Sequence, residues 1–434
     1  MTRAVVPADL DALVRAVGAA LDGAGPPVAP VAPLARPDAA PAGTSVDAAT
    51  APGDGVALVL RTSGSTGAPR EVALSAAAVR ASGAATHERL GGPGHWLLTL
   101  PATHVAGVQV VARAHAAGRG LTVAPPDEPF TPAGFAALVA RAPHGERRYV
   151  SLVPTQLHRL VAAADAGSAD GAAGLDALCS LDAVLLGGAA TPAPLLRRAR
   201  AAGARVVTTY GMTETCGGCV YDGVPLAGAR VRVVPADGSS GETAGVVELS
   251  GPFLADGYLG DPAATAAAFR TDRDGTRWFR TNDLGRLGGP PDAPTLAVLG
   301  RADDVLVSGG VNVAPAAVEA VLAEVEAIGE ACVVGVPHPE WGQEVVAVVT
   351  LAGHRGERAP HEDAPHDGAH GDSAVAPAGL VAAVRDRVAD RLGRAAAPRR
   401  VLVVADLPRR GPGKVDRAAA ARIAVGHPGQ DLPG

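Results

Sequence analysis

The residues best suited to phosphate chemistry lie in two glycine-containing loops near opposite ends of the chain. The later loop, residues 407–416, reads Leu-Pro-Arg-Arg-Gly-Pro-Gly-Lys-Val-Asp and contains Lys414, the only lysine among 38 basic residues. An ammonium on a flexible stem can touch two oxygens in turn, whereas a planar guanidinium favours a fork-shaped partner. A single lysine in a Gly/Pro loop therefore indicates a specific contact, against the alternative that an arginine-rich composition left one lysine by chance.

The earlier loop, residues 61–70, follows the first apolar run and reads Arg-Thr-Ser-Gly-Ser-Thr-Gly-Ala-Pro-Arg. Its backbone N–H groups and hydroxyls can donate hydrogen bonds to phosphate oxygens, and Arg70 adds positive charge. The segment does not match the Walker pattern GxxxxGK[ST]. Taken alone, it could also be an ordinary Ser/Gly turn.

Polar, glycine-containing segments also follow several later apolar runs. They are 101–107 (PATHVAG), 187–191 (GGAAT), 210–215 (YGMTET), 280–285 (RTNDLG) and 300–312 (GRADDVLVSGGVN). In a parallel sheet, ligands bind beyond the carboxyl ends of the strands. Segments in these positions are therefore the expected binding site.

The hydrophobic pattern predicts the elements that position these segments. The predicted buried strands are 56–60, 96–100, 121–124, 149–153, 184–186 and 206–209. Helix-like stretches such as 76–85 and 194–202 lie between several of them, which is typical of a parallel sheet covered on both faces. Residues 8–22 carry a helical apolar stripe, and an Ala/Pro/Gly-rich loop is expected to follow it as far as residue 53.

Two further regions are expected after this sheet. Shorter alternating runs with glycine turns at 228–299 predict an antiparallel subdomain. From about residue 303, helices at 315–325 and 380–392 and strands at 331–336, 345–351 and 401–404 predict a small α+β domain. The expected boundaries are an N-terminal domain at 1–299 with a lead-in at 1–53, a hinge at 300–304, a C-terminal domain at 305–424 and a tail at 425–434.

Inside the C-terminal domain, residues 354–377 form a low-complexity stretch rich in Ala, Pro, His and Asp. Its histidines are His354, His361, His366 and His370. They could chelate a metal, but no helix fixes their spacing, so a solvated surface loop is the favoured interpretation.

Composition excludes several classes of function. A formal charge of −6 and a pI near 6.1 provide no basic field for nucleic acid. No apolar run reaches 18 residues and the first residues lack a signal-peptide pattern, so we expect a cytoplasmic protein with no stable membrane association. Four cysteines in 434 residues do not make a disulfide framework. The sequence leaves the oligomeric state open, a homodimer included.

In this order, these segments and the Lys414 loop resemble the adenylate-forming superfamily of acyl-CoA and aryl-CoA synthetases, adenylation domains and luciferases, over about residues 56–424. Within it, segments 90–98, 104–107, 148–153 and 210–225 resemble the 2-succinylbenzoate-CoA ligases of menaquinone biosynthesis in their short actinobacterial form. The resemblance implies a large α/β domain of parallel sheets with helices and a small antiparallel β subdomain. A small mobile α+β domain is expected to follow.

The resemblance also implies the reaction. A carboxylate of 2-succinylbenzoate attacks the α-phosphate of ATP to give an acyl-adenylate and pyrophosphate, and the thiol of coenzyme A then displaces AMP. Negative charge gathers on the α-phosphate in the transition state, which requires preorganised cations and donors. Glu214 is expected to bind Mg²⁺, with Thr62 as a further ligand. Thr213 is expected to contact the α-phosphate or the acyl carbonyl.

The remaining nucleotide contacts are carried over by position. Arg70 and the loop before it are expected to hold the β- and γ-phosphates. Tyr210 and Gly211 are expected to cover the adenine, and Asp283, with Arg301 nearby, is expected to bind the ribose hydroxyls. The loop and backbone residues assigned to ATP are Ser63, Gly64, Ser65, Thr66, Gly67, Gly188, Ala189 and Ala190.

The acyl group is expected to contact residues from three segments. His104 and Gly107 belong to the turn that follows the second strand, and a pocket role for His104 is favoured over a structural one. Cys216 and Cys219 have redox or zinc spacing, but no second pair exists, so Cys216 and Gly217 are interpreted as a pocket wall. Gln156 is a further candidate.

By the same resemblance, Asp303 marks the hinge about which the C-terminal domain pivots between adenylation and thioester formation. Lys414 would reach the α-phosphate and the substrate carboxylate in the first orientation only. Two positions depart from the family pattern. Arg70 replaces the usual lysine of the phosphate loop, and Asn282 replaces a glycine before the ribose-binding aspartate, an easy replacement if its φ is positive.

Three alternatives remain at the sequence level. The chain could be a ligase for another aryl or acyl acid, a free-standing adenylation domain that loads a carrier protein, or an idle relative that binds nucleotide or acyl groups. The departures at Arg70 and Asn282 favour the idle relative. The retained Glu214, Asp283 and Lys414 argue against it, because a protein without catalysis has no need of all of them.

Overall fold

The computed structural model describes residues 9–30, 55–62, 70–125, 128–235, 244–290, 293–352, 373–410 and 414–427. The chain divides into two compact units. The first comprises 1–189, 198–281 and 286–297, and the second comprises 190–197, 282–285 and 298–434. No helix in the described ranges has both the length and the apolar character needed to cross a membrane.

The main sheet of the first unit is parallel over most of its width. Its strands are β3 (His95–Leu98), β4 (Leu121–Val123), β5 (Arg148–Leu152), β6 (Ala183–Leu186), β7 (Val206–Met212), β8 (Gly217–Tyr221) and β9 (Val224–Pro225). The strand order is β4-β3-β5-β6-β7-β8-β9. The strands from β4 to β7 are parallel, and β8 and β9 then continue the sheet in antiparallel pairing. The expected parallel sheet is confirmed here.

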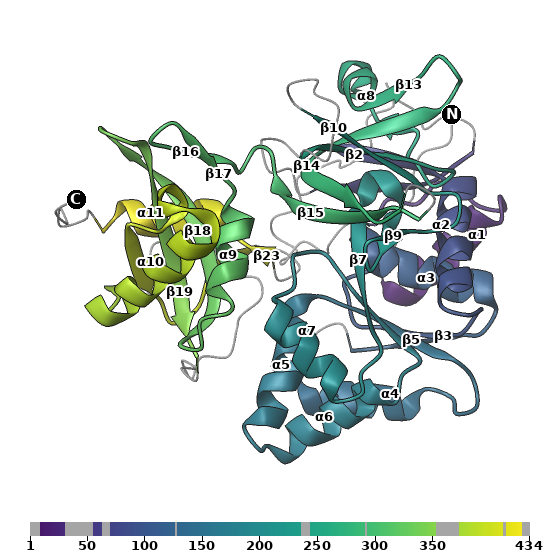
Figure 1. Cartoon of the computed structure of the whole chain (residues 1–434). Helices are drawn as coiled ribbons and strands as arrows, with labels where there is room; N and C mark the ends of the chain where they lie inside the picture. Colours follow the sequence, from purple (N-terminus) through teal and green to yellow (C-terminus); the bar gives the residue numbers. More distant parts are fainter. Residues whose placement is uncertain are drawn as a thin grey trace, which may run out of the picture. The chain divides into compact units, whose positions relative to one another are not determined.

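Helices cover this sheet on both faces. The covering helices are α2 (Ala76–Arg89), α3 (Val105–Ala117), α4 (Pro132–Arg141), α5 (Pro154–Asp165), α6 (Ala169–Cys179) and α7 (Ala193–Ala201). Two further helices lie elsewhere: α1 (Leu10–Leu21) packs on α2 and α3, and α8 (Pro262–Ala268) contacts the strands at 257–258 and 269–271. Trp96 and Leu98 of β3 share a buried cluster with side chains of α2 and α3, while the intervening Leu97 does not belong to that cluster. Figure 1 shows α4 and α6 on the other side of strands β3 and β5 from α2 and α3.

Side-chain caps fix where several of these helices begin. A hydroxyl or carboxylate oxygen just before the helix accepts a hydrogen bond from a backbone N–H of its first turn, which would otherwise lack a partner inside the helix. The capping residues are Asp9, Ser75, Thr131, Ser168 and Asp261. Proline occupies an early position of α4, α5 and α8, where its missing N–H costs nothing.

The first predicted strand does not belong to the main sheet. β1 (Val56–Arg61) pairs antiparallel with β2 (Glu71–Ser75), which in turn pairs with β12 (Gly257–Tyr258). The sequence prediction placed 56–60 in the parallel pattern, and that part was wrong. The short loop between β1 and β2 returns the chain as a hairpin, which a parallel connection of this length could not do.

The region at 228–299 contains antiparallel strand pairs of the kind expected, at 230–235 with 245–250 and at 269–271 with 277–279. It contains β10 (Arg230–Pro235), β11 (Gly245–Ser250), β13 (Phe269–Thr271), β14 (Arg277–Gly288) and β15 (Thr295–Arg301). Their order is β10-β11-β14-β13, and β15 also pairs with β14.

The second unit contains a mixed sheet with helices. Its elements are β16 (Leu306–Ser308), β17 (Val311–Val313), α9 (Pro315–Leu322), β18 (Ile328–His338), β19 (Gly342–Leu351), β20 (Ala374–Val375), α10 (Ala378–Leu392), β21 (Arg400–Val403), β22 (Arg409–Arg410), β23 (Lys414–Val415) and α11 (Arg417–Val425). The sheet order is β17-β16-β19-β21-β20, with β18 on β19. The helices and strands expected for a small α+β domain are confirmed, whereas the histidine-rich residues 354–370 lie outside the described ranges.

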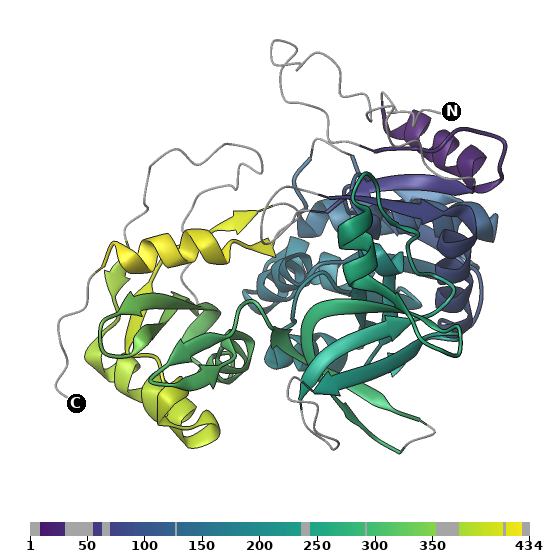
Figure 2. The ribbon, with the colours of Figure 1, turned by 90° about the horizontal axis from the view of Figure 1, so that it is seen from above.

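Successive side chains of β18 and β19 point to opposite faces of the sheet, so the core of this unit has two layers. Val333 packs with side chains of α9 and α10, whereas its neighbours Cys332 and Val334 pack with side chains of α11. Figure 2 shows α10 and α11 on opposite sides of this sheet. A strand with both faces covered reads as a continuous apolar run, and β18 and β19 do so.

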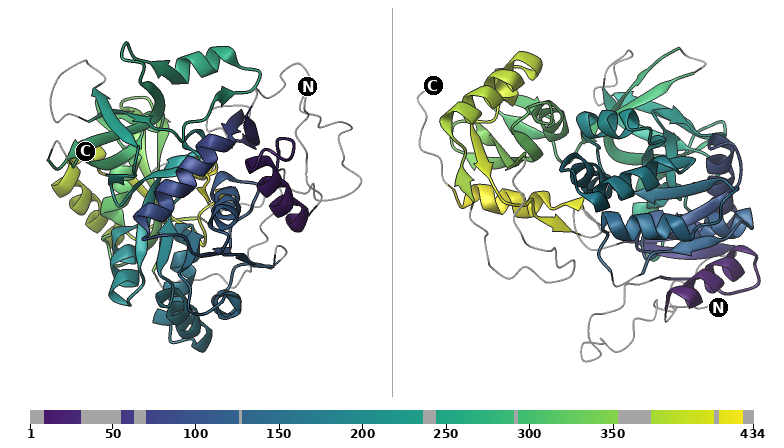
Figure 3. Two further views of the ribbon diagram at one scale, coloured as in Figure 1. Left: turned by 90° about the vertical axis from the view of Figure 1, so that its right-hand side faces the viewer. Right: turned by 90° about the horizontal axis from the view of Figure 1, so that it is seen from below.

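Helix α1 packs against α2 and α3, as Figure 3 shows. The Arg80 guanidinium donates to the Leu21 carbonyl, and the Asp22 carboxylate lies 3.0 Å from Nε2 of His115. These contacts attach the N-terminal helix to the helices that cover the main sheet.

A buried polar cluster lies between α2, α3 and β3. The Trp96 indole N–H donates to Nε2 of His87 over 3.1 Å, and the Arg113 guanidinium lies 5.3 Å from the centre of the Trp96 ring. Burial, and then the charge of Arg113, lower the pKa of His87 from 6.5 to about 4. His87 is therefore neutral at pH 7, as its role as an acceptor requires.

This cluster gives the first unit a specific acid sensitivity. Because the folded-state pKa of His87 lies below its ordinary value, its contribution to stability is complete above pH 6.5 and is lost as the pH falls toward 4. We expect the free energy of unfolding to fall by about 2 kcal/mol more for the wild type than for His87→Gln between pH 7 and pH 4. Glutamine keeps an acceptor for Trp96 but cannot be protonated. Urea unfolding of both proteins at several pH values measures this difference. The same loss of unfolding free energy in both proteins between pH 7 and pH 4 would contradict the role of His87.

Candidate active site

The two ends of the predicted phosphate loop are pinned together. The Thr62 N–H donates to the Arg70 carbonyl over 2.9 Å, and the Arg70 N–H donates to Oγ1 of Thr62 over 3.3 Å. Ser63, Gly64, Ser65, Thr66 and Gly67, which were expected to hold phosphates, lie outside the described residues. The β1–β2 hairpin thus fixes where this loop begins and ends.

A locked turn carries Thr213 and Glu214 just beyond β7. Oγ1 of Thr215 accepts from the Met212 N–H over 2.9 Å and donates to the Gly217 carbonyl over 2.8 Å. Thr215 is completely buried, whereas Thr213 and Glu214 are half-buried. The turn therefore holds its base in the core and leaves the predicted catalytic pair accessible to a ligand.

Glu214 is connected to Arg70 through a tyrosine that the sequence interpretation had missed. The Tyr258 phenol donates to Oε1 of Glu214 over 3.0 Å, and the Arg70 guanidinium carbon lies 5.2 Å from the centre of the Tyr258 ring. Burial, and then the Glu214 carboxylate, raise the pKa of Tyr258, so the phenol keeps its proton. The predicted phosphate and metal residues thus lie at one site, with Tyr258 between them.

The segments expected to bind adenine follow neighbouring parallel strands. Leu186 of β6 is in register with Thr208 of β7, so residues after each strand emerge at the same sheet edge. A Cβ on Gly187 would lie 2.2 Å from Oγ1 of Thr209, so only glycine fits there, and Gly188 has a φ of +85°. This close backbone approach places Gly188 and Ala189 at the same edge as Tyr210 and Gly211.

His104 and Gly107 form the turn that begins α3. His104 is the residue before the helix and is half-buried. A Cβ on Gly107 would lie 2.2 Å from the Pro101 carbonyl oxygen, so glycine is required for packing at this position. The structure thus explains the glycine at position 107 by packing, and its contact with substrate stays a prediction.

Gln156 has a structural role at the start of α5. Its amide oxygen accepts from the Val153 N–H and its amide nitrogen donates to the Thr99 carbonyl, each over 3.1 Å. Both halves of the side chain therefore serve backbone groups at the start of α5. The contact of Gln156 with the acyl group stays a prediction.

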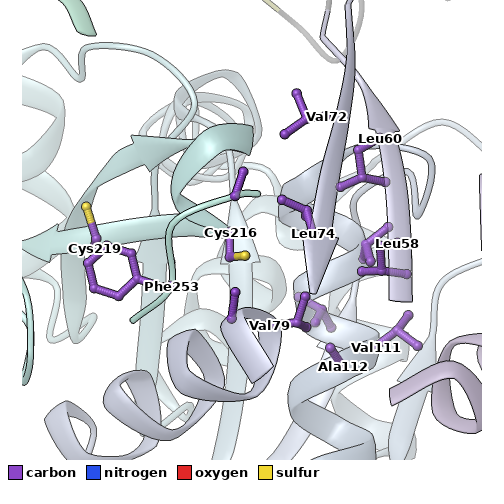
Figure 4. Packing of buried hydrophobic residues seen from close by; sticks show 14 of the residues in the cluster. Leu58, Leu60, Val72, Leu74, Val79, Val111, Ala112, Cys216, Cys219 and Phe253 are labelled. Carbon is purple, nitrogen blue, oxygen red and sulfur yellow. The ribbon is translucent and has the colours of Figure 1, made fainter. Parts of the chain in front are cut away.

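The two cysteines of the Cys216–Cys219 segment are core residues, which Figure 4 draws among buried apolar side chains. Both side chains are almost completely buried, so a pocket wall at this segment would have to consist of its backbone and glycines. Burial raises the pKa of Cys216 and raises that of Cys219 to about 12, so both thiols stay protonated. Gly217 has a φ of +93°, and a Cβ there would lie 3.5 Å from Cγ of Gln109.

Gln109 and Arg113 are polar residues that the sequence interpretation overlooked. They stand one turn apart on α3 and are 1% and 3% exposed. The amide oxygen and nitrogen of Gln109 have no hydrogen-bond partner, and Nε of Arg113 has none either. No acidic side chain among the described residues pairs with Arg113. The signal was available, because these two residues interrupt the apolar run at 105–114 directly after the His104 turn.

The second unit brings Asp283, Arg301 and Asp303 together. Arg301 forms a two-pronged ion pair with Asp303, with N···O distances of 2.7 and 2.6 Å. Asp283 is near enough to raise the pKa of Arg301, after the larger effect of Asp303.

Asn282 lies within strand β14, where no residue has a positive φ. Its carbonyl accepts a hydrogen bond from the Ala302 N–H over 2.7 Å. The glycine expected at this position is therefore not needed for its conformation.

Lys414 lies in a short hairpin in which it pairs with Arg410. Both flanks of the hairpin are tied to the unit. The Arg409 guanidinium contacts the Glu330 carboxylate at 2.6 Å, and Arg417 contacts Glu319 at 2.6 Å and Asp304 at 3.3 Å. The backbone at Lys414 is thus anchored close to the base of its loop.

Glu214 fits a magnesium ion that arrives with a nucleotide. Mg²⁺ is commonly held by one or two carboxylates together with substrate phosphates and water. The described residues contain no cluster of three or more metal-binding side chains. One oriented carboxylate near Arg70 would therefore be a suitable donor for an ion that brings its other ligands with the nucleotide.

Comparison with known proteins gives two family matches. The model of the AMP-binding enzyme family matches residues 7–259, and that of the AMP-binding enzyme C-terminal domain matches 317–414. A probable 2-succinylbenzoate–CoA ligase of Mycobacterium tuberculosis is 41% identical over 386 residues, 87% of each chain. The 2-succinylbenzoate–CoA ligase of Geobacillus kaustophilus is 31% identical over 388 residues, covering 85% of this chain and 69% of the relative.

Solved structures agree with these sequence matches. The o-succinylbenzoate CoA synthetase (MenE) of Bacillus subtilis in complex with the acyl-adenylate OSB-AMP has a TM-score of 0.65 and 26% identity, covering 86% of this chain and 70% of that chain. The same enzyme with ATP and magnesium ion has a TM-score of 0.64 and 26% identity, covering 85% and 70%.

The close approach at Gly107 generates a stability prediction. We expect Gly107→Ala to lower the free energy of unfolding by about 1–3 kcal/mol, because the new methyl group would overlap the Pro101 carbonyl and the turn would have to move. The control is Gly83→Ala on α2, where the nearest atom would be Cγ of Arg113 at an ordinary 3.6 Å. Thermal unfolding of both variants measures the effect, and equal stability of the two would contradict this account of Gly107.

Proposed function

The chain belongs to the AMP-binding enzyme family, and from this premise we propose that it joins 2-succinylbenzoate to coenzyme A at the expense of ATP, through an acyl-adenylate. AMP and pyrophosphate are the other products. The named relatives of 41% and 31% identity support the acid, and the neighbouring structures with an acyl-adenylate and with ATP and magnesium support the route. We further propose that the enzyme acts in the cytoplasm, where ATP and coenzyme A are available.

The observation that carries the choice of acid is the buried charge of Arg113. 2-Succinylbenzoate has two carboxylates, of which one is activated while the other has to be bound as an anion. Nε of the buried Arg113 guanidinium has no hydrogen-bond partner. Burial of such a charge costs several kcal/mol of desolvation, and its contact with the Trp96 ring offsets only part of that cost. A bound carboxylate would supply the missing partner, and the unpartnered amide of Gln109 could donate to the same group.

The first unit would supply the residues for phosphate and metal. Thr62 and Arg70 would hold the β- and γ-phosphates, and Glu214 would bind the Mg²⁺ that neutralises their charge. Thr213 would donate to the α-phosphate as negative charge develops on it. Tyr210, with the backbone at Gly188 and Ala189, would bind adenine at the shared sheet edge.

The second unit would supply the ribose contact and the moving cation. Asp283 would accept from the ribose hydroxyls, with Arg301 holding the local arrangement. Residues 300–304 would act as the hinge between the domains at 1–299 and 305–424. When the hinge turns, Asp303 would either separate from Arg301 or move together with it. Lys414 would bring its ammonium to the reacting oxygens during adenylation and leave for thioester formation.

A product assay tests the proposed function. The protein is incubated with 2-succinylbenzoate, ATP, Mg²⁺ and coenzyme A, and the CoA thioester and AMP are identified by mass spectrometry. Benzoate, fatty acids and other aryl acids form the comparison panel. Activity on a member of that panel without activity on 2-succinylbenzoate would overturn the choice of acid, and absence of AMP with every acid would overturn catalysis.

The role of Arg113 is tested by Arg113→Met. We expect kcat/KM for 2-succinylbenzoate to fall at least about 30-fold, because removal of one member of a buried charge pair costs 2–5 kcal/mol. The affinity for ATP in the absence of acid is expected to stay within about twofold. Arg270→Met, at an exposed arginine of β13, is the matched control. Unchanged kcat/KM in a folded Arg113→Met variant would contradict the assignment.

The role of Lys414 is tested by separating the two half-reactions. We expect Lys414→Ala to slow adenylation by a factor of about 10²–10³, the usual effect of losing one preorganised donor. Thioester formation from supplied acyl-adenylate is expected to remain within a few-fold of wild type. Lys414→Arg should slow adenylation almost as much as Lys414→Ala does. Arg70→Lys should reduce the rate of adenylation only slightly. Equal loss in both half-reactions would contradict a lysine that serves only one of them.

A further inference from the structure

We propose that Tyr258 is a positioning residue that orients the Glu214 carboxylate toward the magnesium ion of bound MgATP and couples it to Arg70 at the end of the phosphate loop. This inference rests on the proposed function, because it requires that Glu214 meets MgATP. Tyr258 itself need not touch the nucleotide.

The hydroxyl of Tyr258 provides the first half of the argument. It donates to Oε1 of Glu214 over 3.0 Å at a partly buried position. A carboxylate on a short surface turn can rotate, and a fixed donor to one of its oxygens removes that freedom. Donors of this kind behind a metal-binding carboxylate commonly change metal affinity by 10–100-fold when they are removed.

The ring of Tyr258 provides the second half. The Arg70 guanidinium lies over its face, with 5.2 Å from the guanidinium carbon to the ring centre. A cation over the face of a phenol draws electron density from the hydroxyl and makes it a stronger donor. The positive charge of Arg70 and the negative charge of Glu214 are thus held on the same aromatic ring, one at its face and one at its hydroxyl.

The backbone around Tyr258 explains why the ring can serve as a fixed support. Its strand β12 pairs with β2, in register Tyr258 to Val72. The Tyr258 N–H donates to Oγ1 of Thr265 over 2.9 Å, and the edge of the ring meets Phe269, with 5.9 Å between ring centres. The ring is 9% exposed, so neither its position nor its tilt is free.

A backbone hydrogen bond adds a direct link to the Glu214 turn. The Ala255 N–H donates to the Glu214 carbonyl over 2.9 Å, and the Leu259 N–H donates to the Glu71 carbonyl over 2.8 Å. The short segment from Ala255 to Leu259 therefore bridges the metal-binding turn and the strand that leaves the phosphate loop. Tyr258 lies on this bridge and directs its side chain to the two charged groups.

Binding of ATP with and without magnesium tests the inference apart from turnover. In Tyr258→Phe the ring stays under Arg70 and only the hydroxyl is lost. We expect calorimetric titration to show MgATP binding weakened by about tenfold, while ATP in excess EDTA binds within about twofold of wild type. In Tyr258→Leu the aromatic ring under Arg70 is also lost. We therefore expect this variant to bind ATP more weakly than the wild type both with magnesium and in excess EDTA.

Tyr149→Phe is the matched control. It removes a phenol that donates to the carbonyls of Leu90 and Gly92 over 3.1 and 3.0 Å, away from Glu214. This control should bind both forms of ATP as the wild type does. Wild-type binding of MgATP by Tyr258→Phe, or an equal loss with and without magnesium, would overturn the inference.

The same variants distinguish this inference from the proposed function. If the wild type forms AMP in a magnesium- and acid-dependent reaction and Tyr258→Phe shows the same magnesium dependence, only the role of Tyr258 is wrong. If the wild type forms no AMP with any acid, the proposed function fails and the role of Tyr258 in it fails as well.

Discussion

The need to hold several negative charges close together is the physical constraint on which this structure depends. A triphosphate and a carboxylate repel each other, so the protein has to present cations and oriented donors that need no rearrangement when charge shifts. In the first unit these groups are placed by elements with little freedom. Arg70 ends a pinned hairpin loop, Glu214 stands on a turn locked by buried Thr215, and Tyr258 connects them from a third strand.

The chain uses its two kinds of basic side chain differently. Arginine occupies a static position at Arg70, which lies over the ring of Tyr258. The single lysine is placed on a hairpin anchored at both flanks by other ion pairs. A compact ammonium is suited to a temporary position in a crowded centre, whereas a guanidinium is suited to a permanent fork-shaped contact. This division of labour agrees with a reaction in which one cation has to arrive and leave.

The sequence predicted the family, the mixed α/β fold and most elements. Its polar, glycine-containing segments follow apolar runs, and this pattern indicates where strands end and where ligands bind. It did not reveal the hairpin of β1 with β2, since an apolar run alone does not show the direction of its partner. Tyr258 was missed because its contacts with Glu214 and Arg70 join segments far apart in the chain. The sequence also did not reveal that the Gln156 amide bonds to backbone groups and that Cys216 is buried in the core, because both facts depend on packing between segments far apart in the chain.

Oxygen transfer from acid to nucleotide tests the central claim most directly. The wild-type protein is incubated with ATP, Mg²⁺, coenzyme A and 2-succinylbenzoate labelled with ¹⁸O in both carboxylates, and the products are analysed by mass spectrometry. If a carboxylate attacks the α-phosphate, each AMP carries one ¹⁸O from the acid while pyrophosphate carries none. Unlabelled AMP, or label in pyrophosphate or inorganic phosphate, would contradict an acyl-adenylate route.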